Sequence, residues 1–296
     1  MENPLIALSN ELAALAARAG HGVVAVHGRP RIPSSGILWR SGVVVTAEHA
    51  LRRDEELRVT LPDGTTAAAE LAGRDPGTDL AVLRLKTAET SSVWETQSAP
   101  AAGHLVLAIG RSADTGVSAA MGVVSSVSGP WHTWRGGKVD RFLRLDVGLY
   151  PGSVGGAVVD AEGRLVGLAT SGLSRTSIIA VPAITIARVV DELLEKGHVA
   201  RGYLGLGLQP IVLPEPKRGG LIVLSVEPDG PAGRGGVVLG DIIVAVSDKP
   251  IANIEDLQDA LGAGSAGKTV KVALVRGGQP LELAITIGER PRRNPA

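Results

Sequence analysis

Hydrophobic positions near the N-terminus follow a helical period. Leucines recur every three or four residues between a start signal at Asn3-Pro4, which suits an N-cap and the first helical position, and a stop signal at Gly20. These leucines are Leu5, Leu8, Leu12 and Leu15. We therefore expect a short amphipathic helix. It would either pack as a lid on the body of the protein, which we favour, or form an oligomer contact.

Between residues 22 and 183 the pattern changes to short runs of Val, Ile, Leu and Thr separated by turn signals. Asp63-Gly64 and Glu162-Gly163 are typical of hairpin turns. A dozen short strands with few helices predict a mainly β architecture, either barrels or a pair of sandwiches. The predicted strands cover residues 22–27, 35–40, 42–47, 56–61, 67–72, 80–85, 104–110, 117–127, 141–146, 157–160, 165–170 and 177–181.

Residues 184–196 carry the one strong helical pattern in the middle of the chain, which ends at Gly197. A second block, residues 202–289, follows. In it we predict strands at 220–226, 241–246, 269–276 and 281–287, and short helices at 231–235 and 253–261. The tail from Pro291 to Ala296 is predicted to be disordered.

The composition is that of a soluble protein long enough for two domains. Thirty basic residues balance 30 acidic ones, which argues against a nucleic-acid binder. No stretch is apolar enough to span a bilayer, and no secretory signal is evident, so the chain as read predicts a cytoplasmic location, or an extracytoplasmic or periplasmic one if a leader has been removed. Because cysteine and ligand-spaced clusters of His, Asp and Glu are lacking, we predict no metal and no other cofactor.

Three segments carry candidate chemistry. Residues 43–50 form a β run that ends in His49, residues 75–83 place Asp79 where a loop enters an apolar strand, and residues 150–160 form a glycine-dense turn. Histidine, then aspartate, then a glycine-rich turn is the chain order of a chymotrypsin-type triad. In such a triad the histidine takes the hydroxyl proton, the aspartate fixes the histidine tautomer, and backbone N–H groups of the turn stabilise the oxyanion.

These segments resemble the HtrA/Deg family of trypsin-fold serine proteases. Residues 46–50 read TAEHA, residues 75–81 read DPGTDLA and residues 151–156 read PGSVGG, close to the family patterns TxxHV, DxxTDLA and PGNSGG. The similarity runs from about residue 21 to about residue 291. It implies a chymotrypsin-like double β-barrel, in which His49 is the base, Asp79 orients it, and Gly152 and Val154 supply the oxyanion N–H groups.

The family's nucleophilic serine falls on Val154, which is where this chain departs from the pattern. Valine has no proton to give and no nucleophilic atom, and loss of the nucleophile costs about a millionfold in kcat. The neighbouring Ser153 is a poor substitute. A shift of one residue moves the side chain by about 3.8 Å and tends to aim it elsewhere.

Residues 203–206, which read YLGL, resemble the carboxylate-binding loop of PDZ domains, and residues 226–232 and 239–243 resemble other runs of the same domain. The resemblance implies that Tyr203, Leu204, Gly205 and Leu206 bind the C-terminus of a peptide through backbone N–H groups. Residues 253–261 would form the helix on the other side of the groove. Residues 129–138 hold two tryptophans and form either a regulatory loop, as the resemblance implies, or a surface loop whose aromatic rings cover the core.

The expected domains are an N-terminal helix (1–21), a trypsin-like domain with its linking helix (22–199), a PDZ domain (200–291) and a tail (292–296). We expect an inactive protease scaffold, a pseudoprotease or chaperone-like adaptor, that binds unfolded polypeptides or peptides with free hydrophobic C-termini. The alternative is an active hydrolase, a serine endopeptidase, whose serine was replaced by engineering. The resemblance also implies a possible homotrimer.

Overall fold

The chain is described here from a computed structural model that covers residues 3–30, 32–86, 94–96, 100–214, 217–262 and 264–289. It divides into two units, Met1–Val199 and Ala200–Ala296. The tail that we predicted to be disordered lies outside the described residues. Within the described ranges, no helix is long and apolar enough to cross a membrane.

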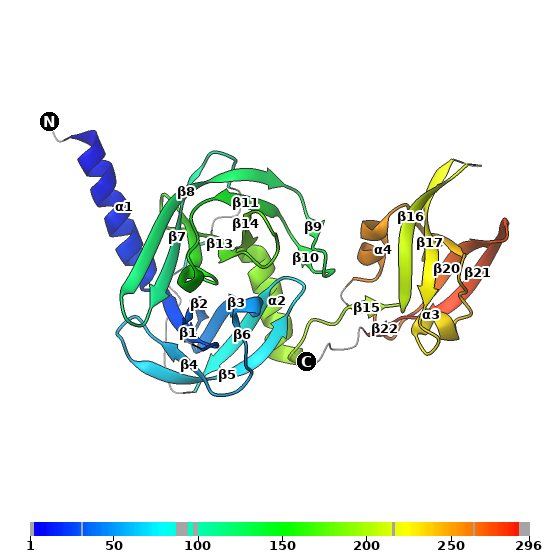
Figure 1. Cartoon of the computed structure of the whole chain (residues 1–296), viewed down its shortest axis with the longest axis horizontal. Helices are drawn as coiled ribbons and strands as arrows, with labels where there is room; N and C mark the ends of the chain where they lie inside the picture. The colour runs from blue at the N-terminus through cyan, green and yellow to red at the C-terminus, as the bar shows by residue number, and fades with distance from the viewer. Residues whose placement is uncertain are drawn as a thin grey trace. The chain divides into compact units, whose positions relative to one another are not determined.

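All twelve strands predicted between residues 22 and 183 are present, and they close into two six-stranded antiparallel barrels (Figure 1). The first barrel has the order β1-β2-β3-β6-β5-β4 and the second the order β11-β14-β13-β12-β7-β8. The strands of the first are β1 (Val23–His27), β2 (Ser34–Arg40), β3 (Val43–Ala47), β4 (Leu57–Thr60), β5 (Thr66–Asp75) and β6 (Leu80–Leu85). Those of the second are β7 (Leu105–Ser112), β8 (Gly116–Ser128), β11 (Phe142–Asp146), β12 (Ala157–Asp160), β13 (Leu165–Thr170) and β14 (Ile178–Pro182).

Several strands are buried on both faces, which explains why their sequences are continuously apolar. In β3, Val44 belongs to the apolar cluster of the first barrel, whereas Val45 and Ala47 belong to a larger cluster that the two barrels share. In β12, Val158 and Val159 divide in the same way between the second barrel and the shared cluster. The largest core of the unit thus contains residues from both barrels, and the predicted site residues border it.

Two helices pack against the barrels of the N-terminal unit. The predicted first helix is α1 (Pro4–Gly20), which begins at the cap Asn3. Leu12, Leu15 and Ala19 in its second half pack on the shared core. Its first half extends from the barrels (Figure 1) and exposes Leu5, Ile6 and Leu8. The second helix, α2 (Ala183–Lys196), contacts strands of both barrels and ends at Gly197 in the left-handed conformation.

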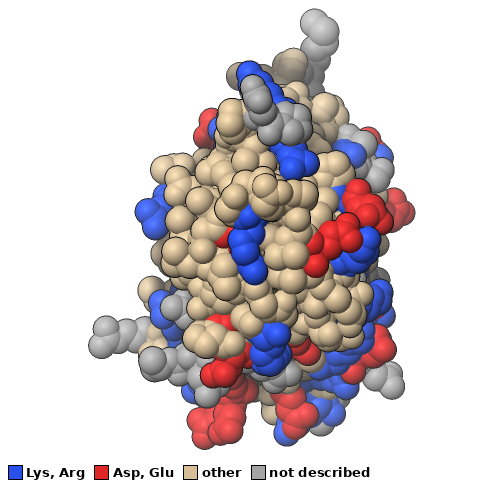
Figure 2. Space-filling model, turned by 90° about the vertical axis from the view of Figure 1, so that its right-hand side faces the viewer, with Lys and Arg blue, Asp and Glu red and all other residues tan. Residues whose placement is uncertain are grey.

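The C-terminal unit is a β-sheet of order β16-β17-β18-β20-β21, with a short strand β19 (Lys249–Pro250) paired to β18. The main strands are β16 (Leu206–Leu213), β17 (Arg218–Val226), β18 (Ile242–Val246), β20 (Thr269–Arg276) and β21 (Gln279–Thr286). The helices are α3 (Pro231–Arg234) and α4 (Ile254–Ala260), and the two-residue strands β15 (Gly202–Tyr203) and β22 (Gly288–Glu289) pair with each other. Figure 2 shows one side of the molecule, where uncharged residues cover much of the surface, a basic side chain stands among them, and other acidic and basic side chains lie around them.

One ion pair links β20 to the start of β18. Asp241, whose side chain is fully buried, accepts hydrogen bonds from Nε and Nη2 of Arg276 at 2.8 Å and from the N–H of Val238 at 2.9 Å. The Arg276 guanidinium lowers the pKa of this carboxyl below its ordinary value of 3.8, against the opposing effect of burial. The folded state therefore holds the Asp241 proton less tightly than the unfolded state does.

Arg276→Gln is expected to destabilise the C-terminal unit, because it leaves a buried carboxylate without its partner. Since the folded pKa of Asp241 is lowered, the stabilisation is present above about pH 4 and is lost as the pH falls through the lowered value. Hydrogen exchange of β18 and β20, followed by mass spectrometry, measures the effect. Lys271→Gln is the control, because it removes an exposed ion pair to Glu282 from the same sheet. Equal exchange in the two variants would show that the Asp241 pair contributes nothing special.

Candidate active site and peptide-binding loop

Strand pairing brings His49 and Asp79 together. β3 and β6 are antiparallel neighbours, and Ala47 pairs with Leu80 at the end of the ladder. The N–H of Glu48 then donates to the backbone oxygen of Asp79 at 3.0 Å, and the N–H of His49 donates to Asp79 Oδ1 at 2.9 Å. His49 Nδ1 lies 3.0 Å from Oδ1 and 2.9 Å from Oδ2 of the same carboxylate. The structure thus brings His49 and Asp79 into contact, in an arrangement that a base and its orienting carboxylate would require.

The backbone conformation of Asp79 and its contacts with Thr170 and Gly172 hold its side chain in place. It has a φ of 57°, a left-handed conformation that aspartate tolerates better than most residues. Its side chain is buried, and Thr170 at the end of β13 donates its hydroxyl to Oδ2. Gly172 follows closely: a Cβ on it would lie 2.5 Å from Asp79 Oδ2 and 2.6 Å from His49 Nδ1. Thr170 therefore hydrogen-bonds to Asp79, and Gly172 packs against both Asp79 and His49. The sequence motifs revealed neither residue.

The glycine-dense turn packs against the first barrel close to this dyad. Ser35 on β2 donates its N–H to the backbone oxygen of Val154 at 2.9 Å and its hydroxyl to that of Gly152 at 2.7 Å. Gly155 has a φ of 83°, and a Cβ on it would lie 2.4 Å from the Ser35 oxygen and 2.8 Å from the N of Ala47. Only glycine fits here, so the turn lies directly against Ala47, which precedes His49 by two positions in the chain.

Val154 and Ser153 point into different surroundings. Val154 is 6% exposed and joins the apolar cluster shared by the barrels. Ser153 is also buried, and its Oγ lies 3.1 Å from the Oγ of Ser118 on β8. A Cβ on Gly110 of β7 would come within 2.5 Å of that Ser153 oxygen. The hydroxyl of Ser153 is thus paired with the second barrel.

Two backbone donors of the turn are unused. Among the described residues, none accepts a hydrogen bond from the N–H of Gly152 or of Val154. Gly152 lies in the short 3₁₀ turn η2 (Pro151–Ser153), and Val154 follows it in an extended conformation. Two free N–H groups of this kind are what an oxyanion hole requires.

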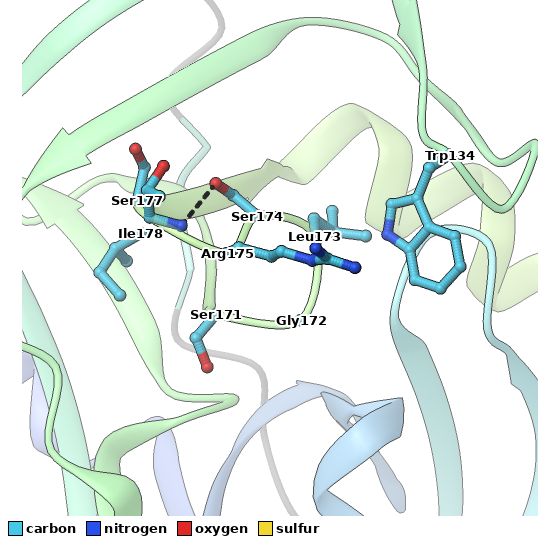
Figure 3. Close-up of a pocket in the computed structure, with 9 residues that line it drawn as sticks. Trp134, Ser171, Gly172, Leu173, Ser174, Arg175, Ser177 and Ile178 are labelled. Atoms are coloured by element: carbon cyan, nitrogen blue, oxygen red, sulfur yellow. Dashed lines mark hydrogen bonds between the residues drawn. The ribbon is translucent and has the colours of Figure 1, made fainter.

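The segment with two tryptophans forms a short hairpin of β9 (Trp131–His132) and β10 (Lys138–Val139). Trp131 packs edge-on against Phe142, with ring centroids 5.3 Å apart, and contacts the shared core. Trp134 is 73% exposed and lines a pocket of about 820 Å³, which the loop between β13 and β14 completes (Figure 3). The hairpin therefore serves both as core cover and as a pocket wall.

The predicted carboxylate-binding loop has a free sheet edge beside it. β16 pairs only with β17 in the described sheet, so its other edge is open, and α4 contacts β16. Gly205 has a φ of 76°, and its backbone oxygen accepts from the N–H of Glu227. None of the described residues accepts a hydrogen bond from the N–H of Leu204 or Gly205. Free N–H groups at the start of an open strand edge suit a peptide that ends in a carboxylate.

Comparisons with known proteins assign this arrangement. The trypsin-like peptidase domain family matches residues 34–168, and the PDZ domain family matches residues 202–287. Serine endoprotease DegS of Escherichia coli is 30% identical over 283 residues, which cover 89% of this chain and 79% of DegS. The chain belongs to the HtrA/Deg family of serine endoproteases.

Other HtrA/Deg relatives extend the match. A probable periplasmic DegP-like serine endoprotease of Brucella suis is 32% identical over 282 residues. The match covers 90% of this chain but only 54% of the length of the Brucella protein. The solved serine endoprotease from Yersinia pestis has a TM-score of 0.79 at 31% identity, covering 94% of this chain and 98% of that one. The HtrA-type protease AlgW, solved with a decapeptide, has a TM-score of 0.78 at 26% identity, covering 95% and 99%.

In HtrA/Deg terms, the structure brings His49 and Asp79 into contact and packs the turn that carries Gly152 and Val154 against β2 and β3. Thr170 and Gly172 complete the site. Tyr203, Leu204, Gly205 and Leu206 lie in the other unit, where they lead into the open edge strand β16.

Gly172→Ala is expected to break the hydrogen bond between His49 and Asp79, because the added methyl group would occupy the space beside both side chains. The far-downfield proton resonance of His49 Nδ1, which a carboxylate partner produces, should be lost. Gly148→Ala is a matched control, because a Cβ there meets nothing within 4 Å. An unchanged resonance in Gly172→Ala would contradict the described packing of Gly172 on the dyad.

Proposed function

We propose that this HtrA-type protein binds polypeptides without hydrolysing them, as a pseudoprotease with a chaperone-like or adaptor role. The observation that carries the proposal is Val154, which occupies the nucleophile position in a turn with free N–H donors, while the contact between His49 and Asp79 is intact. A base and an oxyanion hole without a nucleophile leave a site that can hold a peptide but cannot form an acyl-enzyme.

The state of Ser153 supports the same conclusion. Attack by Ser153 would require its hydroxyl to leave Ser118 and reach the Nε2 side of His49. Its Oγ faces β7 and β8 of the second barrel, close to Gly110. A serine that reacts must lie within hydrogen-bond reach of its base.

The PDZ unit is the second part of the proposal. We infer that it binds the free, hydrophobic C-terminus of a peptide, which adds as a strand to the open edge of β16. Leu206 and Leu208 from β16 and Ile254 and Leu261 from the α4 region are half-buried apolar residues against the core of this unit. They offer an apolar lining beside the N–H groups of Leu204 and Gly205.

Val154→Ser is expected to produce hydrolysis of an unfolded protein such as casein, whereas the unaltered chain should show none above background. The change restores the hydroxyl while the dyad and the turn stay in place, and it should cost about 1 kcal/mol of stability through lost apolar burial. The release of soluble fragments measures the activity.

The double variant His49→Ala with Val154→Ser is the control, and it should be inactive. Cleavage by the unaltered chain that Ser153→Ala abolishes would show that Ser153 is the nucleophile. A chain that carries Val154→Ser and cuts nothing, although folded, would show that the turn does not form a working oxyanion hole.

Peptides with free, hydrophobic C-termini are expected to bind with micromolar affinity, roughly 8 kcal/mol. Amidation of the C-terminus should weaken this binding at least about tenfold, because it removes the charge that the N–H groups recognise. Fluorescence anisotropy of labelled peptides gives both values.

Gly205→Ala should weaken binding as well, because alanine is strained at a φ of 76° and would reshape the loop. Gly240→Ala is a matched control with a φ of 86° and open space around it. Equal affinity for free and amidated peptides would refute the carboxylate-loop assignment while leaving the account of Val154 intact.

A further inference from the structure

The pocket beside the dyad is built almost entirely from one loop. Residues 171–178, which join β13 to β14, line it together with Trp134 from the β9–β10 hairpin (Figure 3). Gly172 is at once a member of this lining and the wall of the His49–Asp79 pair. A polypeptide bound beside His49 would therefore lie close to the Gly172 side of this pocket.

The chemistry of the lining is that of an anion site. Leu173 and Ile178 contribute apolar surface, and most of the remaining side chains are hydroxyls around one guanidinium, that of Arg175. In Figure 3 the Arg175 guanidinium extends toward Leu173 and Trp134. The hydroxyl-bearing lining residues are Ser171, Ser174, Thr176 and Ser177.

Arg175 has no counter-ion among the described residues. The other charges close to the pocket are already engaged. Arg135 stacks over the Trp134 ring at 4.5 Å and contacts Glu48 at 3.8 Å, and Glu48 also pairs with Arg74 at 3.1 Å. Asp79, behind Gly172, is buried and its carboxylate is occupied by His49 and Thr170. The pocket thus carries an unneutralised positive charge.

We propose that this pocket binds a carboxylate of the polypeptide held in the cleft, with Arg175 as the residue that determines the preference. The inference rests on the proposed peptide-binding function and specifies the ligand of that cleft. A planar guanidinium matches a carboxylate with two parallel hydrogen bonds, and the hydroxyls supply further donors. The carboxylate comes either from an acidic side chain within the polypeptide or from its C-terminus.

The test compares the full chain with Arg175→Gln and with Arg18→Gln, an exposed arginine on α1 that serves as the charge-matched control. Three fluorescent probe peptides, blocked at both ends, differ only in a central Glu, Gln or Val. A fourth probe carries the Gln sequence with a free C-terminus. The blocked ends keep the first three probes from the carboxylate loop at Gly205, and anisotropy reports the affinities.

The Glu peptide should bind the full chain about tenfold more tightly than the Gln and Val peptides. Arg175→Gln should remove that preference, and Arg18→Gln should retain it. Arg175→Glu should reverse the preference in favour of a fifth blocked probe, which carries a central Lys, and this result separates a charge effect from loss of folding. If the free-terminus probe gains affinity through Arg175 rather than Gly205, the C-terminal carboxylate is a ligand of the pocket too.

Equal binding of the Glu, Gln and Val peptides would overturn the role of Arg175 and leave the peptide-binding cleft standing. A Glu preference that survives in Arg175→Gln would do the same. If no blocked peptide binds the full chain, the cleft itself is not a peptide site, and the proposed function fails in that part together with this inference.

Discussion

The close approach of the glycine turn to the first barrel is the constraint on which the site depends. Gly155 lies against the backbone of Ser35 and Ala47, at distances that no side chain allows. Gly156 does the same toward the second barrel, where a Cβ would come within 2.1 Å of the oxygen of Ile109. The turn is therefore wedged between the two barrels, and the contacts that hold it there are made by Gly155 and Gly156 rather than by the side chain of residue 154.

This constraint explains how a valine can occupy position 154 without loss of the turn. The position borders the apolar cluster shared by the barrels, and valine adds buried apolar surface there. A serine at the same place would present a hydroxyl to that apolar cluster. Serine would contribute less to packing there than valine does, and its advantage would be its reactive hydroxyl. Valine at position 154 therefore suits the packing of the core.

Most of the fold was predictable because burial on both faces gives many strands continuous apolar runs, as in β3 and β12. β16 was missed because it is an edge strand with no fully buried residue and it contains Gly207 and Pro210, so its sequence resembles a loop. His49 and Asp79 were found because each sits in a recognisable local motif. Thr170 and Gly172 reach the site only through the closing of the second barrel, which no local pattern records.

The contact between His49 and Asp79 also has a structural role. The Asp79 carboxylate accepts the N–H of His49 and the hydroxyl of Thr170, and Thr170 is fully buried. An apolar residue in place of Asp79 would leave both donors without an acceptor, which costs about 1–3 kcal/mol for each buried group. It would also have to adopt a φ of 57°, which aspartate tolerates and β-branched residues do not. The hydrogen bonds of Asp79 therefore stabilise the fold of this unit whether or not the site carries out a reaction.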